Sequence, residues 1–201
     1  MLPDTHKRSP YLLNWKEQTR LFQRLSDHLA QMALFAVNTG CRDGEICKLR
    51  WEWELKLQSM NTTVFIIPGS VVKNGDERLV VLNRIAMSVV ESMRGKHASH
   101  VFCCQGKLLL RMLNGAWLRA RTAVGLPQVR LHDLKHTFGR CLRAAGMSFE
   151  DRQDLLRSRA GHITSHYSAA EHSHLIEAAN SACDRNGVRQ DLVVLRRLSV
   201  S

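Results

Sequence analysis

The stretch TGCRDGEICKLRW, residues 39–51, decides how the rest of this chain is interpreted. Gly40 interrupts a helical run, and the apolar spacing after it predicts a short helix carrying Arg42, Glu45, Ile46 and Leu49. The guanidinium of Arg42 can bind two oxygens of one phosphate, which a lysine cannot do. The alternative is a surface ion pair between Arg42 and Glu45, which adds little stability. Glu45 is expected to orient the arginine or to cap nearby backbone.

Apolar residues recur at helical spacing over most of the remaining chain. Before residue 39 they predict two helices, one around Leu21 and one from Leu29 to Ala36. Beyond Asn83 they predict further helices over residues 85–93, 110–124, 133–145, 150–156 and 170–183. Gly146 and Ser148 are expected to end one of these helices and to cap the next.

A small antiparallel sheet is predicted between these two helical regions. Residues 62–67 are β-branched and apolar, which is typical of a buried strand. Residues 71–73 and 79–82 flank Asn74-Gly75-Asp76, a strong hairpin signal, so Lys73 is predicted to lie at a hairpin end. The fold class predicted is therefore α+β, mainly helical, with a small antiparallel sheet.

The composition favours a polyanionic partner. Lysine and arginine number 29 against 18 acidic residues among 201, which gives a net charge of +11. Cations that neutralise phosphates release condensed counterions, but charge alone does not separate DNA from RNA, an anionic membrane surface or a merely basic exterior. No apolar run reaches the ~20 residues that span a bilayer. A polar start and six cysteines without a CxxC pair predict a cytoplasmic protein with reduced thiols.

Two further segments carry side chains suited to phosphate chemistry. Residues 132–138 read HDLKHTF, and the second of only two tyrosines, Tyr167, follows a histidine-rich segment. The other, Tyr11, lies near the polar leader. A lone tyrosine is most often an amphipathic packing residue. Cutting DNA without a metal requires such a nucleophile, together with cations around the phosphate and a proton donor.

Taken together, these segments resemble the catalytic domain of the tyrosine recombinases, the phage-integrase family that cuts and rejoins DNA through a 3′-phosphotyrosine. The resemblance rests on residues 39–51, Lys73 before a tight turn, residues 132–138 and His166-Tyr167, and it covers roughly residues 14–186. It implies the tyrosine-recombinase catalytic fold and site-specific DNA strand transfer. It also implies that neither a metal nor a nucleotide cofactor is required.

The resemblance gives each matching residue a role. Tyr167 would attack the DNA phosphate, which Arg42 and Lys135 would hold. Lys73 would protonate the leaving 5′-oxygen, and His132 would assist proton transfer or position the phosphate.

Three further positions qualify this assignment. His136, one helical turn beyond His132, is expected to be a hydrogen-bonded core residue that fixes the helix. Lys135 stands where the family usually has its second arginine, so charge is kept while bidentate geometry is lost. Ser158 stands nine residues before Tyr167, where the family has a histidine or tryptophan. His162 is the candidate substitute for that ring, and its alternative role is an exposed loop histidine near DNA.

The predicted organisation is a mobile leader over residues 1–10, a catalytic domain over 11–190 and a tail over 191–201. The tail is expected either to exchange between protomers or to fold back on its own domain. The predicted partners are double-stranded DNA, further copies of the chain on that DNA and accessory DNA-bending proteins, with no membrane. The cell would be bacterial, or the gene phage-encoded.

Three other functions compete with this one. The first is a catalytically impaired DNA-binding remnant of an integrase that lacks the N-terminal clamp domain. Ser158 favours it, as does a chain that starts almost where the catalytic domain would begin. The second is a type IB topoisomerase, whose segments match less closely. The third is a metal protein that uses His162, His166, His172 and His174.

Overall fold

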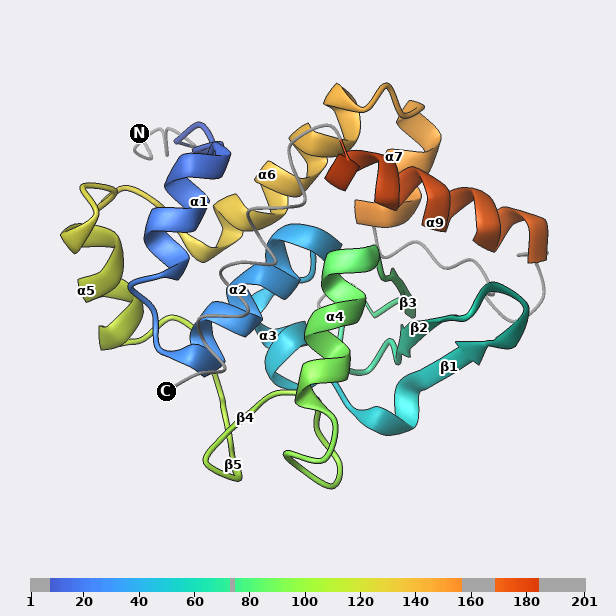
Figure 1. The fold of residues 1–201 in the computed structure, drawn as a ribbon, viewed down its shortest axis with the longest axis horizontal. Coiled ribbons are helices and arrows are strands. Elements are labelled where there is room, and N and C mark those ends of the chain that lie inside the picture. The colour runs from blue at the N-terminus through green and yellow to red at the C-terminus, as the bar shows by residue number, and fades with distance from the viewer. Residues whose placement is uncertain (1–7, 73–74, 157–168, 185–201) are drawn as a thin grey trace, which may run out of the picture.

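The buried helix α2 (Asp27–Thr39) forms the centre of the fold in the computed structural model, which describes residues 8–72, 75–156 and 169–184. Every residue from position 29 to position 39 is buried. A helix that is apolar on all sides is stable only when other elements surround it. Helices α4 (Arg84–Met93) and α6 (Leu131–Ala144) pack against α2 and supply that cover (Figure 1).

Helix α1 (Trp15–Phe22) follows a segment that is fastened to α6. Asn14 caps α1, because its side chain accepts a hydrogen bond of 2.9 Å from the Glu17 amide. Just before the cap, the Leu13 amide donates to the hydroxyl of Thr137 over 3.1 Å. The two helices predicted before residue 39 are thus confirmed as α1 and α2, and Gly40 ends α2 in the left-handed conformation at φ +65°.

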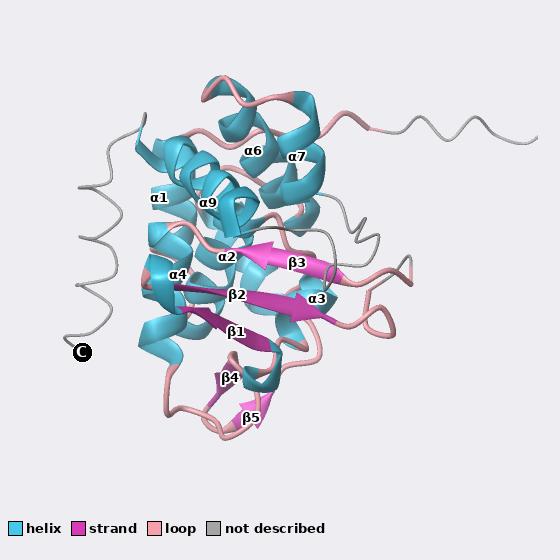
Figure 2. Cartoon of the chain, turned by 90° about the vertical axis from the view of Figure 1, so that its right-hand side faces the viewer, coloured by secondary structure: helices cyan, strands magenta, loops and turns pink. Residues whose placement is uncertain are grey.

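The sheet has three antiparallel strands in the order β1 (Glu54–Leu57), β2 (Thr62–Ile67) and β3 (Arg78–Val81). Its helical cover lies on one side (Figure 2). The prediction of a strand at 62–67 is confirmed, whereas β1 was not foreseen. Strand β3 pairs with β2, in the register Ile67↔Arg78. Val71 and Val72 are not in a strand, so for these two residues the prediction of a strand at 71–73 is wrong. The amides of Val71 and Val72 bond to the carbonyls of Pro68 and Gly69, which curls this segment into turns.

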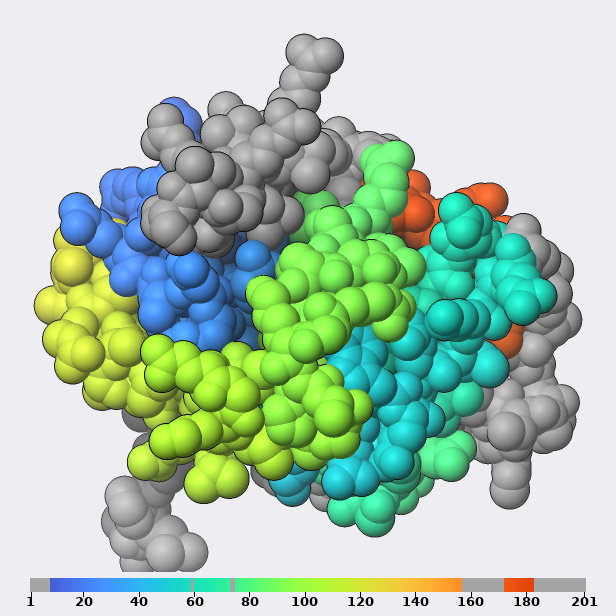
Figure 3. All heavy atoms as spheres, turned by 60° about the horizontal axis from the view of Figure 1, so that its bottom comes forward, coloured from blue at the N-terminus to red at the C-terminus, as the bar shows by residue number. Residues whose placement is uncertain are grey.

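The region between α4 and α6 is less helical than its apolar spacing predicts. A two-stranded ladder, β4 (Cys103–Cys104) and β5 (Lys107–Leu108), precedes α5 (Gly115–Ala123). The helix predicted from residue 110 begins only at Gly115, because Asn114 caps it through a 3.1 Å bond from the Trp117 amide. Figure 3 shows the green residues that follow α4 lying between the blue N-terminal helices and the cyan residues of β1 and β2.

Helices α7 (Phe149–Leu156) and α9 (Ala169–Asp184) pack on α6 and form a second apolar cluster with it. That cluster contains Phe138, Leu142, Leu155, Leu175 and Ala179. Gly146 at φ +80° and Ser148, whose hydroxyl accepts from the Asp151 amide, separate α6 from α7 as predicted. The predicted fold class, mainly helical α+β with a small antiparallel sheet, is confirmed. None of the helices in the described ranges combines the length and apolar character needed to cross a bilayer.

The remaining elements are short. Helix α3 (Asp43–Cys47) carries Glu45 and Ile46 as predicted, but Arg42 is its N-cap residue and Leu49 lies beyond its end. The single-turn helices η1 (Trp51–Trp53) and η2 (Gln58–Met60) lie on either side of β1. Cys41, Cys47 and Cys103 are buried free thiols.

Candidate active site

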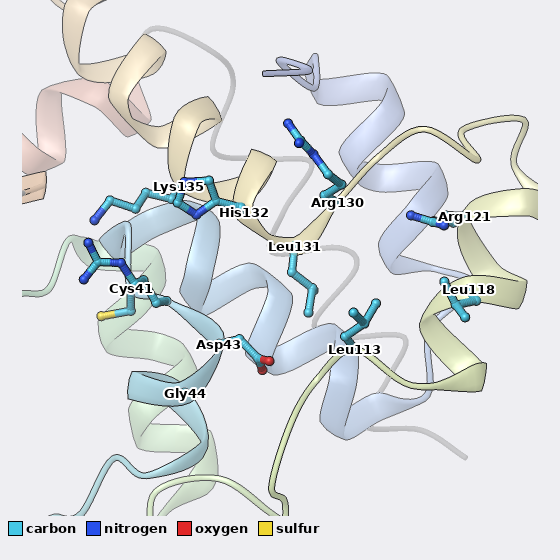
Figure 4. A pocket seen from close by; sticks show the side chains of 11 residues that line it. Cys41, Asp43, Gly44, Leu113, Leu118, Arg121, Arg130, Leu131, His132 and Lys135 are labelled. Atoms are coloured by element: carbon cyan, nitrogen blue, oxygen red, sulfur yellow. The ribbon is translucent and has the colours of Figure 1, made fainter. Parts of the chain in front are cut away.

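A pocket of about 460 Å³ lies where α3, α5 and the start of α6 meet. Figure 4 shows His132 and Lys135 at the α6 end, with Leu118 and Arg121 of α5 at the other. Three of the residues predicted to act on a phosphate, Arg42, His132 and Lys135, line it together. The full lining is Cys41, Arg42, Asp43, Gly44, Leu113, Leu118, Arg121, Arg130, Leu131, His132 and Lys135.

Arg42 is held at the pocket by the turn between α2 and α3. Gly40 makes this turn in the left-handed conformation, and a Cβ there would lie 2.9 Å from Leu156 and 3.1 Å from Phe138. The Arg42 amide donates to Glu45 over 2.8 Å, and its Nη1 donates to the same carboxylate over 3.1 Å. With the Arg42 side chain 36% exposed, the guanidinium is oriented by Glu45 yet open to a ligand.

Glu45 serves two arginines at once. Its side chain is only 3% exposed, and besides Arg42 it accepts a hydrogen bond from Nη1 of Arg78, which is completely buried. Nη2 of Arg78 donates to the carbonyl oxygen of Thr39 over 3.2 Å. Glu45 therefore bonds to Arg42 and joins it to Arg78, a cation that was not predicted as a site residue from the sequence.

Lys135 lies in the wall of the pocket, half-buried. Its Nζ donates to the carbonyl oxygen of Leu156 over 2.6 Å. Burial, together with the positive charges of Arg78 and Arg42, lowers the pKa of Lys135 to about 8. The protonated form of Lys135 is therefore disfavoured by its surroundings, and an anion bound in the pocket would stabilise it.

His132 and His136 lie one turn apart on α6, with their rings edge to face and 4.6 Å between centroids. Partial burial and the neighbouring His136, Lys135 and Arg42 lower the pKa of His132. An imidazole with a lowered pKa is neutral near pH 7 and can accept a proton. Burial likewise lowers the pKa of His136, which is half-buried and not part of the core clusters.

Two carboxylates, those of Asp43 and Asp133, hold the backbone around the pocket in place. Asp43 accepts a hydrogen bond of 2.6 Å from the Met112 amide and so ties the segment that leads into α5 to α3. Asp133 is 0% exposed and accepts from the amides of Arg130 and Tyr11, over 2.8 and 3.3 Å. Its carboxylate thus fixes the start of α6, where His132 and Lys135 are placed.

Several predicted site residues lie outside the described residues. These are Lys73, Ser158, His162, His166 and Tyr167. Of the histidines proposed as metal ligands, His174 is on α9 and lies 3.2 Å from Asp151. Within the described ranges, no three histidine, cysteine or acidic side chains gather as a metal site would require.

Five residues in or beside the pocket were not predicted as site residues from the sequence, namely Arg78, Asp43, Asp133, Arg121 and Arg130. A signal for Arg78 was present, because it is the one charged residue of the otherwise apolar strand β3. An arginine at an inward position of such a strand needs a buried partner. No comparable pattern marked Arg121, whose Nη1 donates to the carbonyl of Val129 over 2.7 Å.

Comparison with known proteins gives a family match and a phage relative. The model of the phage integrase family matches residues 11–174. The integrase of Salmonella phage P22 is 26% identical over 176 residues, which are 81% of this chain and 44% of that protein. The chain therefore spans less than half of the length of this relative.

Solved structures share the fold at low identity. A lambda integrase dimer bound to a COC′ core site matches with a TM-score of 0.59 and 19% identity, over 84% of this chain and 48% of the other. The XerH site-specific recombinase bound to its difH substrate, in a pre-cleavage complex, matches with a TM-score of 0.53 and 19% identity, over 86% and 55%. At this level of identity the likeness concerns the fold alone.

Proposed function

Because the chain belongs to the phage integrase family, we propose that it contains the catalytic domain of a tyrosine site-specific recombinase, which cuts and rejoins DNA. The observation that carries the proposal is the convergence of Arg42, His132 and Lys135 on one pocket, from helices far apart in sequence. Cations around the phosphate and a group that can accept a proton are two of the things that a phosphoryl transfer without a metal requires, besides the nucleophile and a proton donor.

In the proposed reaction, Tyr167 attacks a DNA phosphate and forms a 3′-phosphotyrosyl bond. Its phenolic proton passes to the neutral ring of His132, while Lys73 protonates the leaving 5′-oxygen. A 5′-hydroxyl from another strand then reverses the step. The phosphotyrosine conserves the energy of the broken phosphodiester, so the reaction needs no nucleotide. Arg42 and Lys135 stabilise the negative charge that develops on the phosphate.

The geometry of Arg42 suits this role better than that of Lys135. Arg42 gives only Nη1 of its guanidinium to a described residue, Glu45, which leaves Nη2 and Nε for two phosphate oxygens. Lys135 already donates to Leu156 and offers a phosphate its other N–H bonds as a point charge. With Ser158 in place of an aromatic ring, this supports a slower enzyme than an arginine-bearing relative.

The proposed partners follow from the charge and the relatives. A net charge of +11 favours DNA, and the lambda integrase and XerH structures are complexes with DNA sites. We assign residues 11–190 to the catalytic domain and residues 1–10 to a leader. Residues 191–201 would be a tail exchanged between copies of the chain on DNA, which accessory bending proteins could assist.

A nicked suicide substrate tests the proposal directly. Cleavage of such DNA releases a short strand, so the covalent protein–DNA complex accumulates and is seen on a denaturing gel. We expect a pool of attachment sequences to give this band with wild-type protein and not with Tyr167→Phe. Tyr11→Phe is the matched control, since the Tyr11 hydroxyl lies outside the pocket and donates to Glu17 over 2.6 Å. Salt-sensitive DNA binding without any Tyr167-dependent band would overturn the proposal.

A further inference from the structure

Arg78 is a fully buried arginine next to the pocket, and the proposed chemistry does not use it. Its side chain is 0% exposed and reaches two elements: Glu45 on α3 through Nη1 and the end of α2, at the carbonyl of Thr39, through Nη2. Its Nε is buried without a hydrogen-bond partner among the described residues. Burying an arginine so completely is costly, so a purely structural position would be served better by an apolar residue.

The charges of this cluster have a functional consequence. Arg42 and Arg78 share the single carboxylate of Glu45, so the three side chains together carry one net positive charge. Without Arg78, the same carboxylate would face Arg42 alone and would neutralise the cation that opens onto the pocket. Arg78 thus keeps Glu45 available as an orienting group for Arg42 while cancelling its charge.

The position of Arg78 in the sheet adds a second link. Arg78 is the first residue of β3 and pairs with Ile67, the last residue of β2. The loop between these two residues contains Lys73. The bonds from Arg78 to Glu45 and Thr39 therefore fix the base of that loop against the turn that carries Arg42.

From this geometry we infer that Arg78 is a positioning residue of the phosphate site, which shares Glu45 with Arg42 to keep the pocket cationic and fastens the start of β3 to the turn that carries Arg42. This inference rests on the proposed function, whose phosphate-binding residues it supports. Arg78 touches no substrate in this role. It acts from behind, through Glu45, on the charge and orientation of Arg42.

The pKa of Lys135 is an independent measure of the charge of Arg78. The charged side chains that act on the pKa of Lys135 are Arg78 from β3, Arg42 from the N-cap of α3 and Glu45 from α3; the titratable thiol of Cys41 acts on it as well. Removing Arg78 takes away a neighbouring cation, so the pKa of Lys135 should rise above about 8. A titration of the Lys135 side chain followed by NMR measures this directly and does not depend on cleavage.

The test compares Arg78→Met with the double variant Arg78→Met/Glu45→Gln. The single variant leaves Glu45 facing Arg42, whereas the double variant removes that carboxylate charge and restores a net cation. At saturating nicked DNA, we expect Arg78→Met to lower the single-turnover cleavage rate by about 10- to 100-fold, the size of effect that misplaced catalytic groups produce. The double variant should recover part of this loss, and its Lys135 pKa should return toward the wild-type value.

Two further variants keep the outcome decisive. Arg94→Met removes another paired arginine, one that contacts Glu54 and Glu91 away from the pocket, and should leave the cleavage rate of folded protein within twofold. Arg78→Lys covers the case in which the methionine variant does not fold. One ammonium cannot reach both Glu45 and the Thr39 carbonyl as the guanidinium does, so its rate should fall several-fold.

The possible results separate the two proposals. If wild-type protein forms no Tyr167-dependent complex, the recombinase proposal fails, and the Lys135 titration alone then decides the role of Arg78. If wild-type protein cleaves, a folded Arg78→Met or Arg78→Lys that cleaves as fast would overturn the inference. A double variant no faster than Arg78→Met, with an unchanged Lys135 pKa in both, would overturn it as well.

Discussion

The ammonium of Lys135 lies 2.6 Å from the carbonyl oxygen of Leu156, so one side chain both lines the pocket and fastens α6 to the end of α7. Leu156 also packs where a Cβ on Gly40 would lie, 2.9 Å away. The turn that positions Arg42 and the lysine that faces it thus share one neighbour. Because Lys135 has both roles, its replacement should change the cleavage rate in one variant and the stability of the fold in another.

Lys135→Arg should make the enzyme faster and less sensitive to alkaline pH. An arginine can donate to Leu156 and to a phosphate at once, which should raise cleavage about tenfold. The wild-type rate at subsaturating DNA should fall above about pH 8, where Lys135 loses its proton. The guanidinium stays protonated, so the variant should lack this fall. Single-turnover rates between pH 6 and 10 check both points, and a slower variant with the wild-type profile would contradict them.

Lys135→Met should make the protein more stable near neutral pH. The pKa of Lys135 is lowered from 10.5 to about 8 in the folded state, so the folded protein pays for its charge below about pH 8. The methionine avoids that cost, which is at most about 3 kcal/mol, less about 1 kcal/mol for the lost bond to Leu156.

The sign of the pH dependence distinguishes this effect from simple hydrophobic gain. Between about pH 8 and 10.5 the unfolded chain binds more protons at Lys135 than the folded protein does. The wild-type free energy of unfolding therefore increases as the pH rises through this range. The advantage of Lys135→Met should therefore shrink from pH 7 to pH 10 in urea unfolding. A constant or growing advantage would show that the lysine is not strained.

His132→Gln should remove an acidic limb from the cleavage profile. Burial and the neighbouring cations lower the pKa of His132 from 6.5, so its ring is neutral at pH 7 and gains a proton only in more acidic solution. We expect the wild-type rate at subsaturating DNA to fall as the pH drops below about 6.5, the reference value for histidine. His132→Gln should be slower, by about 10²–10⁴-fold, and flat in this range. His136→Gln, which keeps His132, should retain the limb.

Asp133→Ala should destabilise the domain. Asp133 is 0% exposed and accepts hydrogen bonds from the amides of Tyr11 and Arg130 and from the Arg130 guanidinium. Removing the carboxylate leaves these donors without their acceptor, which should cost about 2–4 kcal/mol. The matched control is Glu52→Ala, which breaks the exposed pair with Arg50 and should cost less than about 0.5 kcal/mol. Urea unfolding measures both, and equal effects would contradict the assignment.

Ser158→His tests whether Ser158 limits the reaction. The expectation rests on the sequence, since Ser158 lies outside the described residues. If a missing ring slows the enzyme, the variant should cleave at least tenfold faster, as one restored acid–base group would allow. Ser158→Ala should give no such gain. Equal cleavage times for the wild type and Ser158→His would indicate that His162, or a rearranged loop, already fills the role.

Local sequence patterns predicted the elements whose signals are short-range. The apolar periodicity of α2, the β-branched run of β2 and the caps around Gly40, Gly146 and Ser148 needed only neighbouring residues to be recognised. The same reasoning failed at Val71 and Val72, whose β-branched side chains predicted a strand. Their amides bond to Pro68 and Gly69, and the pairing partner of β3 is the more distant β2.

The sequence by itself determined the mainly helical fold, and its resemblance to the tyrosine recombinases identified Arg42, His132 and Lys135 as candidates, because the motifs that carry the resemblance are short and local. Only the tertiary structure placed them around one pocket. It alone buried Arg78 behind Glu45 and set the Lys135 ammonium against Leu156. The physical reason is that burial and charge sharing depend on residues brought together from separate strands and helices. Those long-range contacts decide which cations are paired, which are strained and which remain open to a phosphate.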